Sequence, residues 1–269
     1  MSDTAPGRAL VDTHCHLVLL EERGLLDAAL ESAAIAGVEQ IISVGLDVED
    51  SDRNRVIAEA HDNVWFTVGW HPHQQHAPGS REVEALDELL GHPRAVAVGE
   101  IGIDLFFRPG YHDTPLAEQQ RSMHTMLELA STHDKPVVVH DRDAHDQVLA
   151  AIREHPHVRG VMHCFSGDTA LARACVAAGY AISFSGIVTF ARSEAQQAAA
   201  SAVGDDDYVV ETDSPFLAPV PYRGRPNLPG YVAATAAAVA TLRGVEDSLV
   251  RAQSTATARR LFQLPGAPT

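Results

Sequence analysis

The sequence predicts a single TIM-type (β/α)8 barrel with an extra C-terminal helix. Its 269 residues are close to the size typical of such barrels, about 250 residues. Eight apolar, β-type runs alternate with segments of helical apolar spacing. The runs are continuously apolar, which is typical of parallel strands buried on both faces. An open doubly wound sheet is the alternative fold, but it requires a glycine-rich phosphate loop after the first strand, where this chain has His14 and His16.

The first half of the chain supplies four strands. Val11 with Leu10 ends a short buried strand, and the β-branched run QIISVGL ends in glycine before the next helix. That helix is expected to begin with Asp50 or Ser51 as its N-cap. The elements after the first strand are, in order, a helix over 25–38, a strand over 40–46, the helix of DSDRNRVIAEAHD, a strand over 64–73 that runs into a His-rich loop, a helix over 81–91 and the strand AVAVGEIGID.

The second half repeats the pattern and then ends in helices. Asp168 is expected to open the helix over 168–178. Alanine is the strongest helix former, so the Ala-rich segment 231–243 is read as a closing barrel helix rather than low complexity. The predicted elements are a helix over 115–133, PVVVHDRD, a helix over 144–154, GVMHCFSG, the helix 168–178, YAISFSGIV, a helix over 194–203, YVVETDSPF, the helix 231–243 and a final helix over 245–262.

The composition indicates one domain of a cytoplasmic protein without membrane association. The start, MSDTAPGRAL, lacks the basic and apolar regions of a secretory signal, and no apolar run reaches the about 20 residues of a bilayer span. Cys15, Cys164 and Cys175 form no disulfide framework, and the first two are expected to be small core residues. The predicted domain covers 9–264, with short flexible termini at 1–8 and 265–269. Nothing indicates an obligate protein partner, so a monomer is expected.

Polar side chains follow the predicted strands in a way that core packing does not explain. His14 and His16 lie two residues apart, on one side of an extended backbone, so both imidazoles can reach one metal ion. Glu100, His140, His163 and Asp213 each follow an apolar run. Because barrel active sites lie at the carboxyl ends of the strands, these six side chains are expected to form one.

Four histidines and two carboxylates are too many for one structural zinc site. They suit two divalent cations that share a carboxylate and hold the attacking and leaving oxygens of a displacement at phosphorus. Glu100 is the expected bridge, because it arises between the two histidine pairs along the chain. Asp213 could ligate the first ion and accept the proton of the attacking water. The mixed ligands leave Mg²⁺, Mn²⁺ and Zn²⁺ open as the native metal.

Six ordered motifs resemble one known family. VDTHCHL, VGEIGID, VVVHDRD, MHCFSG, ETDSPFL and the R-x-N-x-P of Arg225, Asn227 and Pro229 are similar to the TatD family of metal-dependent deoxyribonucleases, along nearly the whole chain. The resemblance implies a TIM barrel of the metallohydrolase superfamily that hydrolyses phosphodiester bonds in DNA, with an exonuclease type of cleavage expected. It also implies the metal ligands, which are His14, His16, Glu100 and Asp213 for one ion and Glu100, His140 and His163 for the second.

The chain departs from this family after its fourth strand. The family commonly has a tyrosine after the aspartate of E-I-G-L-D-Y, whereas Leu105 follows Asp104 here. This departure leaves the ligands intact and concerns the substrate contacts. Candidates for those contacts are His71 and His73, in the GWHPH loop, and Arg142 and Arg225, since arginine matches phosphate bidentately.

Two other function classes remain open. An amidohydrolase or lactonase acting on a small molecule would share the first His-x-His and the last Asp, but its usual bridge is a carboxylated lysine at a strand end. The only lysine, Lys135, precedes its strand. A non-catalytic metal-binding protein is disfavoured because ligands around an open rim favour water activation. The formal net charge of −16 disfavours binding to polyanions unless metal ions and arginines reverse the sign at the site.

Overall fold

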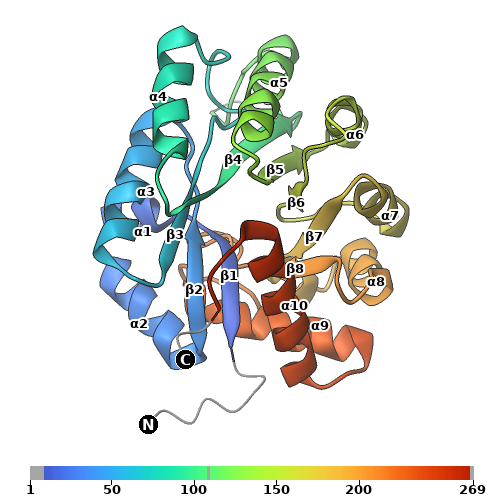
Figure 1. The fold of residues 1–269 in the computed structure, drawn as a ribbon. Coiled ribbons are helices and arrows are strands. Elements are labelled where there is room, and N and C mark those ends of the chain that lie inside the picture. The colour runs from blue at the N-terminus through green and yellow to red at the C-terminus, as the bar shows by residue number, and fades with distance from the viewer. Residues whose placement is uncertain (1–8, 108–109, 267–269) are drawn as a thin grey trace.

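The computed structural model describes residues 9–107 and 110–266, and it confirms the predicted barrel. Eight parallel strands lie in the order in which they occur along the chain, with the helices around the outside (Figure 1). The strands are β1 Leu10–Cys15, β2 Val38–Ser43, β3 Val64–Val68, β4 Ala95–Asp104, β5 Val137–Arg142, β6 Gly160–Met162, β7 Tyr180–Phe184 and β8 Tyr208–Val210.

The helices follow the predicted alternation, with α1 as an unpredicted addition. The helices are α1 Leu17–Glu22, α2 Leu26–Ala36, α3 Val48–Ala60, α4 Ser80–Leu90, α5 Leu116–Thr132, α6 His145–Glu154, α7 Thr169–Ala177, α8 Glu194–Ala202, α9 Val232–Arg243 and α10 Asp247–Phe262, with 3-10 turns η1 Gly186–Thr189 and η2 Pro229–Tyr231.

The helix caps test two of the local predictions. Asp168 caps α7, because its side chain accepts a hydrogen bond from the backbone N–H of Leu171 at 2.9 Å, as predicted. The predicted cap of α3 was wrong. Asp47 takes that place and accepts from the N–H of Asp50 at 2.8 Å, so the helix begins earlier than expected. Aspartates stand near both positions, and only the backbone geometry decides which carboxylate reaches a free N–H group.

The barrel closes between β1 and β8 largely through polar groups. The buried carboxylate of Asp12 accepts hydrogen bonds from the Thr212 N–H at 2.8 Å and the Thr212 hydroxyl at 2.6 Å. Beyond β8, the Asp213 N–H donates to the His14 carbonyl and the His16 N–H donates to the Ser214 carbonyl, each at 2.8 Å. This closure joins the first and last candidate metal ligands by their backbones.

Helix α10 covers the end of the barrel opposite these ligands. The Thr255 hydroxyl donates to the carbonyl of Ala9, just before β1, and Arg260 donates to the carbonyl of Asp206, just before β8. Phe262 belongs to a compact apolar cluster with the strand residues Val11, Ile42, Val138, Val161 and Val209. The extra C-terminal helix therefore plugs the barrel at the amino ends of its strands (Figure 1), leaving the carboxyl ends open for function.

The limits of the domain stay a prediction. Residues 1–8 and 267–269, part of the predicted flexible termini, lie outside the described residues. Pro265, the first residue of the predicted C-terminal segment 265–269, is held against the barrel, because its carbonyl accepts a hydrogen bond from the Gln40 side chain at 3.2 Å. None of the helices in the described ranges is long and apolar enough to cross a membrane.

We expect Phe262→Ala to lower the free energy of unfolding by about 3–5 kcal/mol, the usual cost of truncating a buried aromatic side chain. Phe262 is 2% exposed, whereas Leu249 on the same helix is 45% exposed. Leu249→Ala is the matched control and should change stability by less than about 0.5 kcal/mol. Urea unfolding of metal-free protein provides the measurement. Equal effects of both substitutions would show that α10 does not plug the barrel.

Candidate metal centre

All six predicted ligands lie together at the carboxyl end of the barrel. His14 is in β1, Glu100 in β4 and His140 in β5. His16, His163 and Asp213 lie just beyond the ends of β1, β6 and β8. Glu100 follows an apolar run, and β4 continues through it to Asp104, in agreement with the predicted strand AVAVGEIGID. A cavity of about 610 Å³ opens over this cluster, a size typical of sites for small ligands.

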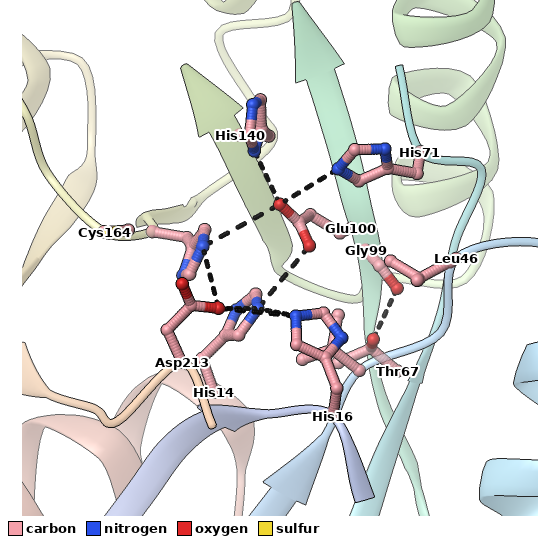
Figure 2. A network of polar contacts seen from close by, with 12 residues as sticks. His14, His16, Leu46, Thr67, His71, Gly99, Glu100, His140, Cys164 and Asp213 are labelled. Carbon is pink, nitrogen blue, oxygen red and sulfur yellow. Dashed lines mark hydrogen bonds and ion pairs between the residues drawn. The ribbon is translucent and has the colours of Figure 1, made fainter. Parts of the chain in front are cut away.

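Glu100 occupies the middle of the cluster (Figure 2). It is 2% exposed, and its two oxygens face different groups. Oε2 lies 3.5 Å from His14 Nε2, whereas Oε1 lies 2.7 Å from His140 Nδ1 and 3.8 Å from His163 Nε2. His71 Nε2 is also 3.5 Å from Oε1. A carboxylate with one oxygen toward each of two histidine groups has the geometry that a bridge between two ions requires.

The first group fits a metal ion by its distances. His14 Nε2 and His16 Nε2 are 3.4 Å apart, and Asp213 Oδ1 lies 3.4 Å from His16 Nε2 and 3.8 Å from His14 Nε2. Atoms bound about 2.1 Å from one tetrahedral ion are about 3.4 Å apart. The residues present therefore fit a divalent cation.

The second group consists of Glu100, His140 and His163, whose ligand atoms lie within 4.8 Å of one another. Asp213 Oδ1 is 3.8 Å from His163 Nε2 and so lies between the two groups. A further set of the same kind is formed by His73, Asp104 and His112, beside the cavity. Both groups that the motifs implied are thus assembled in space by the barrel.

Two buried carboxylates that the motif analysis did not assign to the site, Glu211 and Asp104, hold the histidines in place. Glu211, 1% exposed, lies 2.8 Å from His163 Nδ1 and accepts from the Cys164 N–H at 2.8 Å. Asp104, fully buried, lies 3.2 Å from His140 Nε2 and 2.8 Å from His73 Nε2. Carboxylates in this position fix the orientation of a ligating imidazole and raise its basicity. Both carboxylates directly follow apolar strand residues, and this position in the sequence could have identified them as candidates for the site.

Burial and charge shift the pKa values of the cluster in opposite directions. Burial lowers the pKa of His14 to about 3. Burial also disfavours charged His140 and His163, but Asp104 and Glu100 raise the pKa of His140 to about 9, and Glu211 and Glu100 raise that of His163 to about 10. For Glu100, burial would raise the pKa, but the surrounding histidines, led by His71, hold it well below its ordinary range. Without metal, the buried carboxylates are thus balanced by protons on histidines.

The predicted substrate contacts divide into two sets. His71, His73 and Arg142 line the cavity. Arg225 does not line it, and its side chain is exposed on the loop after β8, so the structure gives no support to its predicted role.

Tyr111 lies beside Asp104, next to the departure at Leu105. Its hydroxyl lies 3.4 Å from Asp104 Oδ2 and accepts a hydrogen bond from Arg142 Nη1 at 2.7 Å. The guanidinium of Arg142 lies 3.9 Å from the ring centroid of Phe106. A tyrosine from the following loop thus supplies a hydroxyl beside Asp104, and the aromatic neighbours pre-organise the arginine.

Cys164 does not pack in the core as expected. It lines the cavity and is half-buried, whereas Cys15 is fully buried as expected. Its φ of 44° is in the left-handed region, which a non-glycine residue rarely adopts. The expectation of a core residue was wrong because β6 ends at Met162 and the chain turns there.

Comparison with known proteins identifies the family. Residues 11–263 match the family described as TatD related DNase. The chain belongs to this family. It is 38% identical over 260 residues to the Escherichia coli metal-dependent hydrolase YcfH, covering 95% of this chain and 96% of that protein. It is 32% identical over 243 residues to the Klebsiella pneumoniae 3'-5' ssDNA/RNA exonuclease TatD, covering 88% and 91%.

A solved structure agrees with the barrel. The E. coli TatD homologue YjjV has a TM-score of 0.89 and 30% identity, covering 97% of this chain and 100% of that one. The family resemblance drawn from the motifs is therefore confirmed. The protein is a metal-dependent hydrolase, and it uses divalent metal.

We expect metal binding to release protons. Histidine must be neutral to ligate, and the pKa values of His140 and His163, about 9 and about 10, keep both protonated at pH 7.5 without metal. Zn²⁺ or Mn²⁺ binding should therefore release roughly two protons, and the affinity should rise with pH until these groups lose their protons. Calorimetric titrations in buffers of different ionisation enthalpy measure this number.

His163→Ala should release about one proton fewer than wild type. The control is His133→Ala, at a surface residue paired with Asp87, and it should release as many protons as wild type. Metal binding to wild type without any proton release would contradict the charge balance described above.

Proposed function

We propose that the protein hydrolyses phosphodiester bonds in DNA, as an exonuclease-type deoxyribonuclease that uses two divalent cations. The observation that carries the proposal is Glu100, whose two oxygens face the His14 group and the His140 group separately. The family and the name of the Klebsiella relative support nucleic acid as the substrate. In this proposal His14, His16, Glu100 and Asp213 hold one ion, and Glu100, His140 and His163 hold the other.

The side chains around the ions have distinct tasks in this proposal. Bound divalent ions polarise a phosphoryl oxygen and make a water molecule more acidic. Asp213, 8% exposed at the floor of the cavity, accepts the proton of the attacking water at a carboxylate oxygen. Glu100 keeps its negative charge because its pKa is held low. Glu211 and Asp104 are positioning residues, since they act through His163 and His140.

Arg142, His71 and His73 are proposed to contact the substrate. Among the residues that the structure describes, Arg142 is the only lysine or arginine that lines the cavity, and it forms no ion pair with them. Its guanidinium lies against the rings of Phe106 and Tyr111, with donors left for a phosphate oxygen. His73 is the neighbour of Asp104 rather than of Glu100, so it is proposed to bind substrate at the edge of the centre.

The amidohydrolase or lactonase alternative is disfavoured by Lys135. Its Nζ donates to the carbonyl of Ala95, the first residue of β4, at the amino end of the barrel. A lysine at that end cannot bridge ions at the opposite end. The remaining expectations stay proposals: a monomer in the cytoplasm, in keeping with the free thiols of Cys15, Cys164 and Cys175, with Mg²⁺, Mn²⁺ or Zn²⁺ as the native metal.

We expect chelation to abolish hydrolysis of end-labelled single-stranded DNA and a divalent ion to restore it. The reason is that the described residues of the centre include no Ser, Cys or Lys nucleophile paired with a general base. The same preparations are assayed on lactones, amides and phosphomonoesters, with metal content measured in parallel. Full DNA hydrolysis after verified metal loss would refute the metal role. Turnover of a lactone or amide with no turnover of DNA would favour the alternative class.

We expect Asp213→Asn to stay folded, retain part of its metal and lose roughly 10²–10⁴-fold in kcat, the usual range for deleting a general base. Asparagine keeps the shape and an oxygen donor but accepts no proton. Glu246→Gln, at the surface before α10, is the control and should leave kcat unchanged. Full metal occupancy with kcat within about threefold of wild type would remove Asp213 from the catalytic step.

A further inference from the structure

The cavity over the metal centre has two chemically different sides. Its floor and one side are polar, with Glu100, Asp213 and Arg142 among the lining residues. The other side, which we call the apolar wall, is formed by Leu19, Leu46, Ile187, Phe216 and Leu217. These residues come from α1, the loop after β2, η1 and the loop after β8. A metal centre that bound only phosphate would have no use for this apolar surface.

Phe216 is the outstanding member of the apolar wall. It is 44% exposed, and none of the other exposed large hydrophobic side chains in the described ranges lines the cavity. Its ring centroid is 5.8 Å from that of His16, so the ring borders the first ligand group directly. The guanidinium of Arg23 lies 5.8 Å from the ring centroid of Phe216, and the ring still remains largely exposed beside a polar centre. A ligand that covers the ring would remove this apolar surface from water.

The loop that carries Phe216 is held in one conformation. The buried side chain of Asn227 donates to the Phe216 carbonyl at 2.7 Å and to the Thr212 carbonyl at 2.8 Å. Leu217 has a φ of 51°, a left-handed conformation for a branched residue. Gly186 has no side chain where the Leu217 carbonyl approaches, since a Cβ there would lie 2.3 Å from that oxygen. The apolar wall is therefore pre-formed before any ligand binds.

We propose that the apolar wall is a nucleobase subsite, in which the base of the nucleotide being cleaved off stacks on Phe216 while its phosphate lies over the metal centre. This inference rests on the proposed function and deepens it. A nucleotide combines an anionic phosphate with a flat, largely apolar base, which is the same division that the cavity shows. Stacking on an aromatic side chain requires an unpaired base and tolerates every base, because each has a π-face.

The geometry also restricts where the rest of the strand runs. Phe216 borders the His16 side of the centre, whereas Arg142, with its Phe106 and Tyr111 neighbours, is adjacent to Asp104 and His140. The base on Phe216 and the next phosphate on Arg142 therefore lie on opposite sides of Glu100. Such an arrangement favours a frayed or single-stranded terminus, because a paired and stacked base cannot reach the apolar wall.

The experiment compares the metal-dependent hydrolysis of two substrates by Phe216→Ala and by wild type. The two substrates differ only at the terminal nucleotide. One set of single-stranded oligonucleotides has natural terminal nucleotides, and the other has a tetrahydrofuran residue, which lacks the base, at the 3′ or the 5′ end. Phe216→Ala should lower kcat/KM roughly 5- to 150-fold on the natural terminus, the range found for losing one base stack. On the terminus without a base, it should change kcat/KM about twofold or less.

Two further variants test the interpretation. Phe216→Trp keeps a stacking surface and should retain activity on the natural terminus. Phe107→Ala removes another aromatic ring, which is 50% exposed and does not line the cavity. This variant should leave kcat/KM unchanged on both substrates. Metal content and thermal unfolding are measured for each variant, so that a folding defect is recognised.

The outcomes distinguish a failure of the nucleobase subsite from a failure of the proposed phosphodiesterase function. If wild type cleaves neither oligonucleotide, the proposed function itself fails. If wild type cleaves DNA but Phe216→Ala loses the same factor on both termini, Phe216 only shapes the cavity. If Phe216→Ala keeps the kcat/KM of wild type on both termini, the base does not contact the apolar wall. Both of these latter results would overturn the subsite while leaving the phosphodiesterase intact.

Discussion

The structure of this site depends on the burial of negative charge at the carboxyl end of the barrel. Glu100, Asp213, Asp104 and Glu211 are all 8% exposed or less, and a buried carboxylate is stable only when a positive charge or several hydrogen bonds compensate it. In the metal-free protein, protons on His140 and His163 supply that charge. Two divalent ions would supply compensating positive charge in the same place. Metal binding therefore replaces one set of cations by another within an otherwise fixed frame.

The barrel makes this frame rigid. Parallel strands bring His14, Glu100 and His140 to one rim, and α10 packs against the opposite end, so the polar cluster need not contribute to closing the core. At the rim, Cys164, Asp213 and Leu217 have φ values of 44°, 60° and 51°. Non-glycine residues in the left-handed region cost about 1–3 kcal/mol each and persist only where the surroundings enforce them. All three residues line the cavity, so the strained backbone positions lie at the candidate site.

An acidic protein that acts on DNA needs local positive charge. The net charge is −16, and long-range attraction for a polyanion is therefore lacking. In the proposed function, Arg142 and the divalent ions supply the attraction in one place, over the cavity of about 610 Å³. Binding to DNA then depends on the cavity rather than on an extended basic surface. This restriction agrees with an enzyme that acts on strand ends, where a single unpaired nucleotide can enter.

The sequence by itself determined the barrel, the alternation of its strands and helices, and the six residues proposed for the metal centre. Apolar periodicity is a local property, and a ligand after a strand must lie on the rim, whatever the packing. Tertiary structure decided the rest. The pairing of Glu211 with His163, the closure of Asp12 on Thr212 and the hold of Asn227 on Phe216 join groups that no local pattern relates. Likewise, Arg225 was placed by motif alone, and only the fold could show that its side chain lies outside the cavity. Which polar residue meets which is set by loop paths and side-chain directions, and those depend on contacts between distant parts of the chain.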